Sequence, residues 1–587
     1  MNTIDVDKIG NECVEWAKKT FGDEFAFRKY QKETCVDVIF EFLSGNKNYI
    51  LEAPTGSGKS ITAMIIGGVL SEYYGKTGYV LVSDLSLIEQ YERDIETYLD
   101  DSWGLIKGKD NYTCIKNTMP FILGECQQKE KFGYDYNYIR NRYDCASICP
   151  YFAAQQRALR SKMTVCTYHL WFTYQNMNRE DKLFGMRDFI ICDEAHKLVD
   201  IIQSIFSIKI SNLERNYIDT INKYLPDGEQ FLGVCLQSAI DRLFSTKENK
   251  ILLSESLDKA KDAFNNFANA TSSNLKDIQE RVPSSKLRAF MYAYSWVRDA
   301  ADSIELFINS IKDNLNNMVV SYNKIKDDEI LTLNSLDEDY LMKKYFYPYF
   351  RNCLYMSATI GDPAIYANNC NMKSYVSNVV SSTFDFSRSP ICYCPTYDMS
   401  YAHKYESIPH VADMCTAICR FNPNSRGCIL TSSYDIMDRI YERLPLDVKP
   451  RVLLYKNSKD KREVISKFKF TEGAILMGPS LFDGLSFDDD LCRFLIITKV
   501  PYLDMSNEFI KEKLKTNYMW YYSQASLSII QGVGRGVRNE HDWCYSYILD
   551  GGFGKLYKTT RSMYGNHISS RMMTIDENFN IKAYNII

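Results

Sequence analysis

The chain has 587 residues, of which 45% are hydrophobic and 25% are charged, and its formal net charge is −4. This length exceeds what one hydrophobic core can organise and predicts roughly three to four domains. The weak negative charge argues against a protein that is basic throughout, so any basic track for nucleic acid must be local.

Two features indicate where the protein resides. No apolar run approaches the roughly 18 residues needed to span a bilayer. The first residues lack the basic and then apolar order of a secretory signal. We therefore expect an intracellular protein, in the cytoplasm or in a eukaryotic nucleus, that is neither secreted nor membrane-bound. Its 18 cysteines are then expected to be mostly reduced thiols.

Residues 1–48 predict helices on both sides of the stretch Phe27-Arg-Lys-Tyr-Gln31. A glutamine just upstream of a phosphate-binding loop can read adenine, because its amide has one donor side and one acceptor side. A surface glutamine on an amphipathic helix explains Gln31 equally well.

The stretch Glu52-Ala-Pro-Thr-Gly-Ser-Gly-Lys-Ser60 follows a short apolar run and precedes a helical pattern. Its glycines let backbone N–H groups point inward, and the helix that follows adds its dipole. Lys59 offers a charge to the β- and γ-phosphates of ATP, and Ser60 offers a hydroxyl to Mg²⁺. A glycine-rich turn with a chance Gly-Lys-Ser is the alternative for this stretch alone. The predicted nucleotide-binding residues are Gln31, Thr55, Gly56, Ser57, Gly58, Lys59, Ser60 and Gln531.

The pattern that follows is strand-like over residues 78–83 and helical over 61–74 and 85–99. It predicts a parallel α/β domain with its site at the carboxyl ends of the strands. Two further buried strands are expected at 163–167 and 189–193. The second of these ends in Asp193-Glu194, which suits Asp193 to a Mg²⁺ shell and Glu194 to orienting the attacking water. An acidic pair at a strand end can also simply cap a helix.

Residues 107–166 interrupt this pattern, and the first four cysteines within them are separated by 11, 18 and 3 residues. Four thiolates from loops can bind Zn²⁺ or an iron–sulfur cluster. The spacing differs from the paired C-x₂-C of a zinc ribbon, which favours iron–sulfur, while scattered core cysteines remain the alternative. The predicted ligands are Cys114, Cys126, Cys145 and Cys149.

From about Lys197 to Leu336 the pattern is helical, and we interpret its apolar stripes as core. A strand ending in Ser357-Ala-Thr359 follows, and a second α/β pattern begins near residue 376 without a second phosphate loop. Gln531-Gly-Val-Gly-Arg-Gly-Val-Arg538 is expected on a helix that starts near Ser523. Arg535 and Arg538 could then face one way, as a guanidinium pair aimed at a γ-phosphate from a facing domain. A solvated basic turn is the alternative.

Taken together, these stretches resemble the motifs of the superfamily 2 helicases, in the iron–sulfur DEAH-box branch typified by XPD and DinG. The resemblance covers nearly the whole chain. The stretches that carry it are the Q motif (Phe27–Gln31), motif I (Ala53–Ser60), motif II (Asp193–His196), motif III (Ser357–Thr359), motif V (Gly478–Phe487), motif VI (Gln531–Arg538), and the flanks of Cys114 and Cys149.

The resemblance implies an α/β fold with two RecA-like parallel-sheet motor domains, a 4Fe-4S insertion and a helical arch. The expected division is motor domain 1 at residues 1–106, 163–199 and 343–375, the cluster insertion at 107–162, the arch at 200–342, and motor domain 2 at 376–587. It also implies an ATP- and Mg²⁺-dependent enzyme that moves 5′-to-3′ on single-stranded DNA, works at duplex junctions, and takes part in DNA repair or replication. RNA–DNA hybrids are a further candidate substrate, and a monomer is expected.

Three departures from the family pattern stand out. Ala53 replaces a glycine, and Asp550-Gly-Gly lacks the arginine that commonly follows this aspartate. Only 26 residues precede the Q motif, so we expect no exonuclease-like domain. Three other functions stay open: a nucleic-acid-dependent translocase without strand separation, a P-loop kinase or metabolic enzyme, and a non-catalytic nucleic-acid-binding protein.

Overall fold

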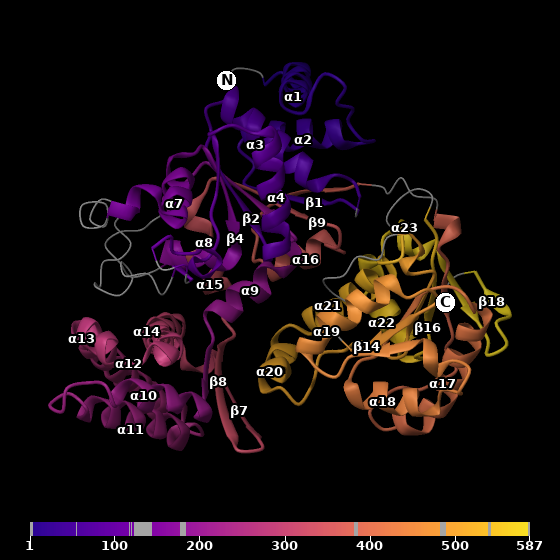
Figure 1. Cartoon of the computed structure of the whole chain (residues 1–587). Helices are drawn as coiled ribbons and strands as arrows, with labels where there is room; N and C mark the ends of the chain where they lie inside the picture. Colours follow the sequence, from indigo (N-terminus) through magenta and orange to yellow (C-terminus); the bar gives the residue numbers. More distant parts are fainter. Residues whose placement is uncertain are drawn as a thin grey trace.

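The structure, a computed structural model, describes residues 4–54, 56–116, 118, 120–121, 144–176, 184–380, 386–479, 481, 489–537 and 542–584. The predicted site residues Thr55, Cys126 and Arg538 lie outside these ranges, as does most of the motif V stretch. Figure 1 shows three bodies: two that are each built on a twisted sheet, and a third made mainly of helices.

The first lobe is a seven-stranded parallel sheet in the order β10-β1-β9-β5-β2-β4-β3. Its strands are β1 Asn48–Glu52, β2 Gly78–Val82, β3 Trp103–Leu105, β4 Met163–Thr167, β5 Phe189–Asp193, β9 Asn352–Ser357 and β10 Val376–Val379. The helices of this lobe are α1 Val6–Phe21, α2 Gln31–Leu43, α3 Lys59–Glu72, α4 Leu85–Tyr98, α7 Pro150–Arg160, α8 Tyr168–Asn176 and α16 Pro363–Asn369.

The last strand of this sheet corrects one predicted boundary. β10 pairs with β1, from Tyr49↔Val376 to Glu52↔Val379. The first sheet therefore ends at residue 379, four residues past the expected end of motor domain 1 at residue 375. The short run Val-Ser-Asn-Val at residues 376–379 carries no signal for which sheet it joins, because pairing is decided by the neighbour that the strand meets.

The second lobe is an eight-stranded sheet in the order β13-β14-β12-β15-β16-β11-β17-β18, parallel except for β18. Its strands are β11 Ile391–Tyr393, β12 Gly427–Leu430, β13 Val452–Leu454, β14 Ile475–Gly478, β15 Phe494–Ile497, β16 Tyr545–Ile548, β17 Met572–Ile575 and β18 Ile581–Ala583. The helices of this lobe are α17 Lys404–Phe421, α18 Tyr434–Arg443, α19 Ser458–Phe470, α20 Glu508–Thr516, α21 Tyr518–Val533, α22 Gly552–Thr559 and α23 Asn566–Ser569. Two parallel-sheet lobes confirm the predicted α/β class.

The third body lies between β5 and β9 in sequence and is mainly helical. Its helices are α10 Arg215–Asn222, α11 Phe231–Thr246, α12 Lys250–Ser273, α13 Leu275–Arg281 and α14 Ser284–Ile311. The two helices at its ends in sequence, α9 Leu198–Ile205 and α15 Glu338–Tyr345, pack in the hydrophobic core of the first lobe. The apolar stripes expected as core are buried, with Phe264 and Val297 both at 0% exposure.

The purely helical prediction for this body was wrong in one part. An antiparallel sheet in the order β6-β8-β7 forms from β6 Ile208–Ser211, β7 Met318–Ile325 and β8 Asp328–Ser335. The hairpin between β7 and β8 turns at Lys326, whose φ is 56°. Along β8 the residues from Leu331 to Ser335 alternate between buried and partly exposed, which is the two-residue period of a half-buried strand.

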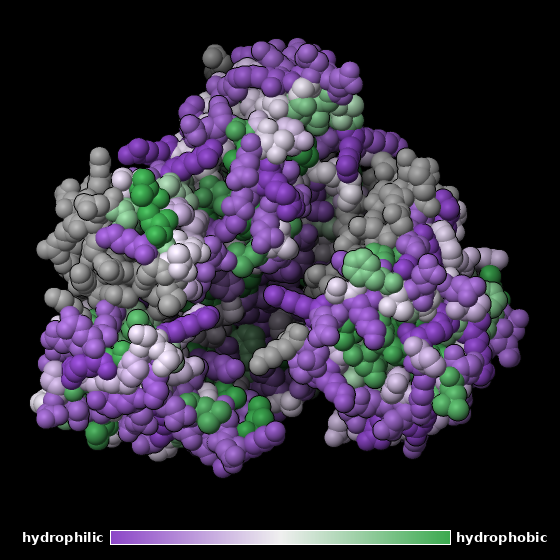
Figure 2. Space-filling model, viewed as in Figure 1, coloured by the Kyte–Doolittle hydropathy of each residue, from purple (hydrophilic) through white to green (hydrophobic). Residues whose placement is uncertain are grey.

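The surface in this view is mostly hydrophilic and is hollowed where the three bodies meet (Figure 2). In the part of the chain that the structure covers, no helix has both the length and the apolar character that crossing a membrane requires.

Candidate nucleotide site and lobe interface

The predicted phosphate loop connects β1 to α3 at the carboxyl edge of the first sheet. β1 lies between β10 and β9, so the phosphate loop emerges between two neighbouring strands. Gly56 and Gly58 have φ values of 79° and 84°, which side chains with a Cβ rarely adopt. The two glycines therefore give the loop its turn, and α3 begins immediately after Gly58, at Lys59.

The loop is braced from outside by the segment that precedes α2. The Gln31 Nε2 amide donates to the Gly58 carbonyl at 3.2 Å and to Thr62 Oγ1 at 3.3 Å. The Arg28 guanidinium donates to the Gly56 carbonyl, and its backbone N–H donates to Gln31 Oε1 at 3.1 Å. Gln31 is 5% exposed, so it lies against the phosphate loop with both sides of its amide bonded within the chain. Its contact with adenine stays a prediction.

The two polar side chains at the start of α3 contact residues from neighbouring elements. Lys59 Nζ donates to the Ala53 carbonyl at 3.3 Å, across its own loop. Ser60 Oγ accepts from Gln90 Nε2 at 3.0 Å. The neighbouring Tyr91 hydroxyl donates to Asp193 Oδ2 at 3.1 Å. Helix α4 thus contacts both of the residues predicted to bind Mg²⁺.

The acidic pair lies at the end of β5, which pairs with β9 from Phe189↔Asn352 to Asp193↔Met356. Asp193 is 2% exposed, and its Oδ1 accepts the Glu194 N–H at 3.0 Å. Glu194 has a left-handed backbone with φ 53°, which turns its side chain away from the strand direction. Strands β1, β9 and β5 are neighbours, so the phosphate loop and this acidic pair share one edge of the sheet.

The surroundings shift the pKa values of the two carboxyl groups in opposite directions. Burial, together with the negative charge of Glu194, raises the pKa of Asp193. Burial also acts to raise the pKa of Glu194, but a hydrogen bond and the charge of His196, with Lys59 and Lys197 nearby, lower it overall. The lowered pKa keeps Glu194 ionised, which suits a group that orients a water molecule.

A hydrogen-bonded chain crosses from this site to the second lobe. Ser357 Oγ donates to Glu194 Oε2 at 3.2 Å and lies 2.8 Å from His196 Nδ1. The other ring nitrogen of His196 lies 3.0 Å from Gln531 Nε2, and this amide also donates to Thr359 Oγ1 at 3.2 Å. Gln531 is on α21 of the second lobe. It therefore contacts the ends of both β5 and β9.

The predicted arginine pair is placed differently from the expectation. Helix α21 begins at Tyr518 and ends at Val533, so Arg535 lies in the turn after the helix. The prediction that Arg535 lies on this helix was therefore wrong, and Arg538 lies outside the described residues, so the pairing of the two guanidinium groups stays a prediction. Arg535 is 4% exposed, and it lies close enough to Cys492 for its charge to act on that thiol.

Three of the four predicted cluster ligands are described. Cys149 caps the start of α7, and Cys114 and Cys149 are both buried. Burial raises the pKa of the Cys149 thiol, backbone hydrogen bonds from Phe152 and Tyr151 oppose this, and the charges of Cys145 and Cys114 also act on it. The donor chemistry fits an iron–sulfur group, but the described residues contain no group of three or more His, Cys, Asp or Glu side chains arranged to hold a metal ion.

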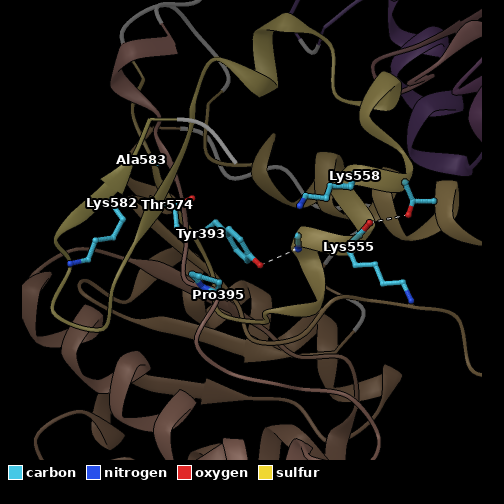
Figure 3. Close-up of a pocket in the computed structure, with 9 residues that line it drawn as sticks. Tyr393, Pro395, Lys555, Lys558, Thr574, Lys582 and Ala583 are labelled. Carbon is cyan, nitrogen blue, oxygen red and sulfur yellow. Dashed lines mark hydrogen bonds between the residues drawn. The ribbon is translucent and has the colours of Figure 1, made fainter. Parts of the chain in front are cut away.

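A separate pocket of about 730 Å³ opens on the second lobe near the ends of β11 and β17. Figure 3 shows Tyr393 pointing to the start of α22, where its hydroxyl accepts the Gly554 N–H at 3.1 Å. Lys555, Lys558 and Lys582 surround the pocket, and Lys582 pairs with Asp576 at 2.8 Å. All of its lining residues belong to the second lobe, so it is separate from the phosphate loop.

Comparison with protein families finds two matches. Residues 24–224 match the model described as "Type III restriction enzyme, res subunit", and residues 415–570 match the model described as "Helicase C-terminal domain". The first match spans the phosphate loop and the acidic pair, and the second spans Gln531 and Arg535.

Two curated relatives and two solved structures extend this similarity. Probable ATP-dependent helicase MJ0942 of Methanocaldococcus jannaschii is 20% identical over 87% of this chain and 90% of its own length. ATP-dependent DNA helicase CHL1 of Meyerozyma guilliermondii is 22% identical over 69% of this chain, which spans 56% of that protein. A structure titled XPD helicase aligns over 94% of this chain and 100% of its own, with a TM-score of 0.58 and 16% identity. S. tokodaii Xpd4 aligns over 93% and 100%, with a TM-score of 0.56 and 14% identity.

These comparisons support the resemblance of this chain to the XPD/DinG-like helicases of superfamily 2. The match to a helicase C-terminal domain and the similarity to ATP-dependent helicases agree with the resemblance given by the ordered motifs, and with it the use of ATP.

Several residues that shape this site could not be predicted from the sequence. Arg28 contacts the phosphate loop, Tyr91 contacts Asp193 and Gln90 contacts Ser60. Glu52 was noted only as the residue at the start of the loop. Gln90 and Tyr91 lie on an amphipathic helix, where a polar residue gives no sign of its partner. A signal was present only for Arg28, through its place beside Gln31.

Proposed function

We propose that this chain is an ATP-driven DNA helicase that moves 5′-to-3′ on single-stranded DNA and separates duplexes at a junction. The observation that carries the proposal is the contact of Gln531 from the second lobe with His196 and Thr359 of the first. Two residues beside the predicted γ-phosphate position are thereby joined to the other lobe. A change at the phosphate can therefore change how the lobes meet.

The residues of the first lobe are assigned as follows. Lys59 neutralises the β- and γ-phosphates, and Ser60 and Asp193 are the ligands for Mg²⁺, which supplies charge stabilisation at the transferring phosphoryl group. Glu194 orients the attacking water. Arg535 and Arg538 are assigned to stabilising the transition state from the second lobe, on the strength of the motif alone. Closure of the lobes brings these groups together, and loss of the γ-phosphate releases them.

A translocase must hold any sequence, so its contacts should be to backbone phosphates and stacked bases. The family resemblance assigns them to residues 83–90, 431–434 and 480–486. In the described part of these stretches, Asp84 and Ser433 cap the starts of α4 and α18 with their side chains. Both helices therefore begin where their strands end, at the expected surface for nucleic acid.

The domain division is also a proposal. We assign motor domain 1 to residues 1–106, 163–199 and 343–379, the cluster insertion to 107–162, the arch to 200–342 and motor domain 2 to 380–587. The shift of the last boundary from 375 to 379 follows from the pairing of β10 with β1.

We further assign Cys114, Cys126, Cys145 and Cys149 to a 4Fe-4S cluster. The support is the family resemblance of the flanks of Cys114 and Cys149, together with the backbone N–H groups of Phe152 and Tyr151 that hydrogen-bond to Cys149. Anaerobically purified protein should contain about four irons and absorb near roughly 400 nm. Cys149→Ser should lose both the iron and the absorption, while Cys235→Ser, an exposed cysteine on α11, should keep both. Stoichiometric zinc in a colourless protein would contradict the assignment.

The test of the function is strand displacement on matched DNA duplexes with a 5′ or a 3′ single-stranded tail, with ATP and Mg²⁺. We expect unwinding of the 5′-tailed duplex only. ATPase activity stimulated by single strands without displacement would identify a translocase, and an RNA–DNA hybrid tests the strand preference. Absence of ATPase activity, with nucleic acid still bound, would identify a non-catalytic binding protein.

A further inference from the structure

A buried carboxylate lies between the phosphate loop and the lobe interface. Glu52 is the last residue of β1, it is 7% exposed, and the loop begins at the next residue. Its Oε2 accepts the Gly361 N–H at 2.6 Å, and the Ile360 N–H also hydrogen-bonds to this carboxylate. The side chain of Glu52 thus holds the segment that follows motif III, on the adjacent strand.

The segment that Glu52 holds is also the one that the second lobe contacts. Gly361 has φ 78°, and a Cβ added to it would lie 2.4 Å from Met563 Cε, so it packs closely on the short helix Arg561–Met563. The Asp362 N–H lies 3.3 Å from Met563 Sδ. At the start of the segment, Thr359 accepts from Gln531, which also belongs to the second lobe. Four consecutive residues therefore meet the phosphate-loop strand on one side and the second lobe on the other.

A carboxylate at this position is costly for the fold. Burial raises the pKa of Glu52 to about 7, although the two backbone N–H groups and the charge of Lys59 oppose this. A buried strand end normally carries an apolar residue, and the other members of β1 on this sheet include Ile50 and Leu51 at 0% and 1% exposure. The N–H groups of Ile360 and Gly361 give the carboxylate its role, because no apolar side chain could accept from them.

We propose that Glu52 is a positioning residue that fixes the backbone of Ile360 and Gly361, and so holds Thr359 and Gly361 in place for the second lobe when the phosphate loop is occupied. This inference rests on the proposed ATP-driven function. In this arrangement the carboxyl end of β1 has two roles. The backbone forms the phosphate loop, and the Glu52 side chain sets the surface on which the second lobe closes.

The test compares Glu52→Ala, Glu52→Gln and the control Glu33→Ala, an exposed glutamate in the first turn of α2, in the full chain. ATPase activity is measured with and without single-stranded DNA, over a range of ATP concentrations. We expect Glu52→Ala to lower the DNA-stimulated kcat by about 10-fold or more and to change KM for ATP by less than about 3-fold. Glu52→Gln keeps a carbonyl acceptor for the two N–H groups and should restore kcat to within about 3-fold.

A double-mutant cycle with Thr359→Val tests whether the two residues act through one contact. The loss in the double variant should be close to the larger single loss, because both changes release the same interface. Additive losses would overturn the proposal. A wild-type kcat in Glu52→Ala would also overturn it, and so would equal changes in kcat and KM.

Hydrogen exchange separates this inference from the proposed function. The amides of Ile360 and Gly361 should exchange faster in Glu52→Ala than in wild type, and at the wild-type rate in Glu52→Gln. Unchanged exchange in Glu52→Ala overturns the proposal even if the ATPase behaves as expected. A wild-type chain without DNA-stimulated ATPase would defeat the proposed function, and faster exchange would then still support the hydrogen bonds on which Glu52 acts.

Discussion

The two lobes share one architecture but place their functional residues in different ways. In the first lobe, the residues directly after three neighbouring strands carry the site: the phosphate loop after β1, Glu194 after β5, and Thr359 after β9. In the second lobe, Gln531 lies on a helix and Arg535 in the turn after it. The site residues of the first lobe therefore lie at strand ends. Those of the second lobe lie on a helix and the turn after it, at the surface that faces the first lobe.

This difference predicts different effects on activity for substitutions in the two lobes. Parallel strands fix the relative places of their carboxyl ends, so the first site needs only one sheet to form. The residues of the second lobe act only when the lobes meet at the Gln531 contacts. We therefore expect substitutions in the first lobe to remove catalysis outright, and substitutions at the Gln531 contacts to reduce its stimulation by nucleic acid.

The largest effect is expected at Lys59. Lys59→Ala removes the charge assigned to the phosphates, so both basal and DNA-stimulated ATPase should fall by at least about 100-fold. The control is Lys18→Ala, in the last turn of α1. Steady-state ATPase assays measure both rates. Turnover at the wild-type level in Lys59→Ala would show that the first lobe does not hold the phosphates as proposed.

The next effect tests the second lobe. Gln531→Ala removes the amide that contacts His196 and Thr359, and we expect the DNA-stimulated kcat to fall by about 10-fold while basal ATPase changes by less than about 3-fold. Gln524→Ala, on the same helix, makes neither of these hydrogen bonds and should retain stimulation. Equal loss of basal and stimulated rates would erase the proposed distinction between the lobes.

The stability of the chain is expected to depend on pH through Glu52 in the first lobe. Its pKa is raised to about 7, so the folded chain binds a proton more tightly than the unfolded chain. Stability should therefore fall as pH rises through this window, by about 2 kcal/mol for the wild type relative to Glu52→Gln between pH 5 and pH 8. The groups facing this carboxyl are the Lys59 ammonium and the N–H groups of Ile360 and Gly361. Calorimetric Tm values across the range measure the difference, and parallel curves would contradict it.

The smallest effect is expected outside the sheet. Arg28→Ala removes an exposed hydrogen bond to the Gly56 carbonyl, so KM for ATP should rise by about 3-fold with little change in kcat. Lys29→Ala, on the neighbouring exposed residue, should leave KM unchanged. A loss of kcat in Arg28→Ala would mean that this brace affects chemistry as well as binding.

Local sequence patterns by themselves determined the nucleotide site of the first lobe. Glycines at positive φ, a lysine and a serine at fixed spacing, and an acidic pair after a buried strand each act within a few residues of one strand. Their pattern therefore predicted both the fold class and the ligand. The same local signals placed the apolar stripes of α12 and α14 in the core.

Only the tertiary structure decided the contacts that join distant segments. The pairing of β10 with β1, the β7–β8 hairpin, the end of α21 before Arg535, and the contacts of Glu52, Gln90 and Tyr91 depend on which neighbour each residue meets. A polar side chain in a helix or at a strand end has the same local sequence whether its partner is water or a buried group. That partner is fixed by packing against another segment, 30 residues away for Gln90 and Ser60 and 309 residues away for Glu52 and Gly361, and no local pattern records it.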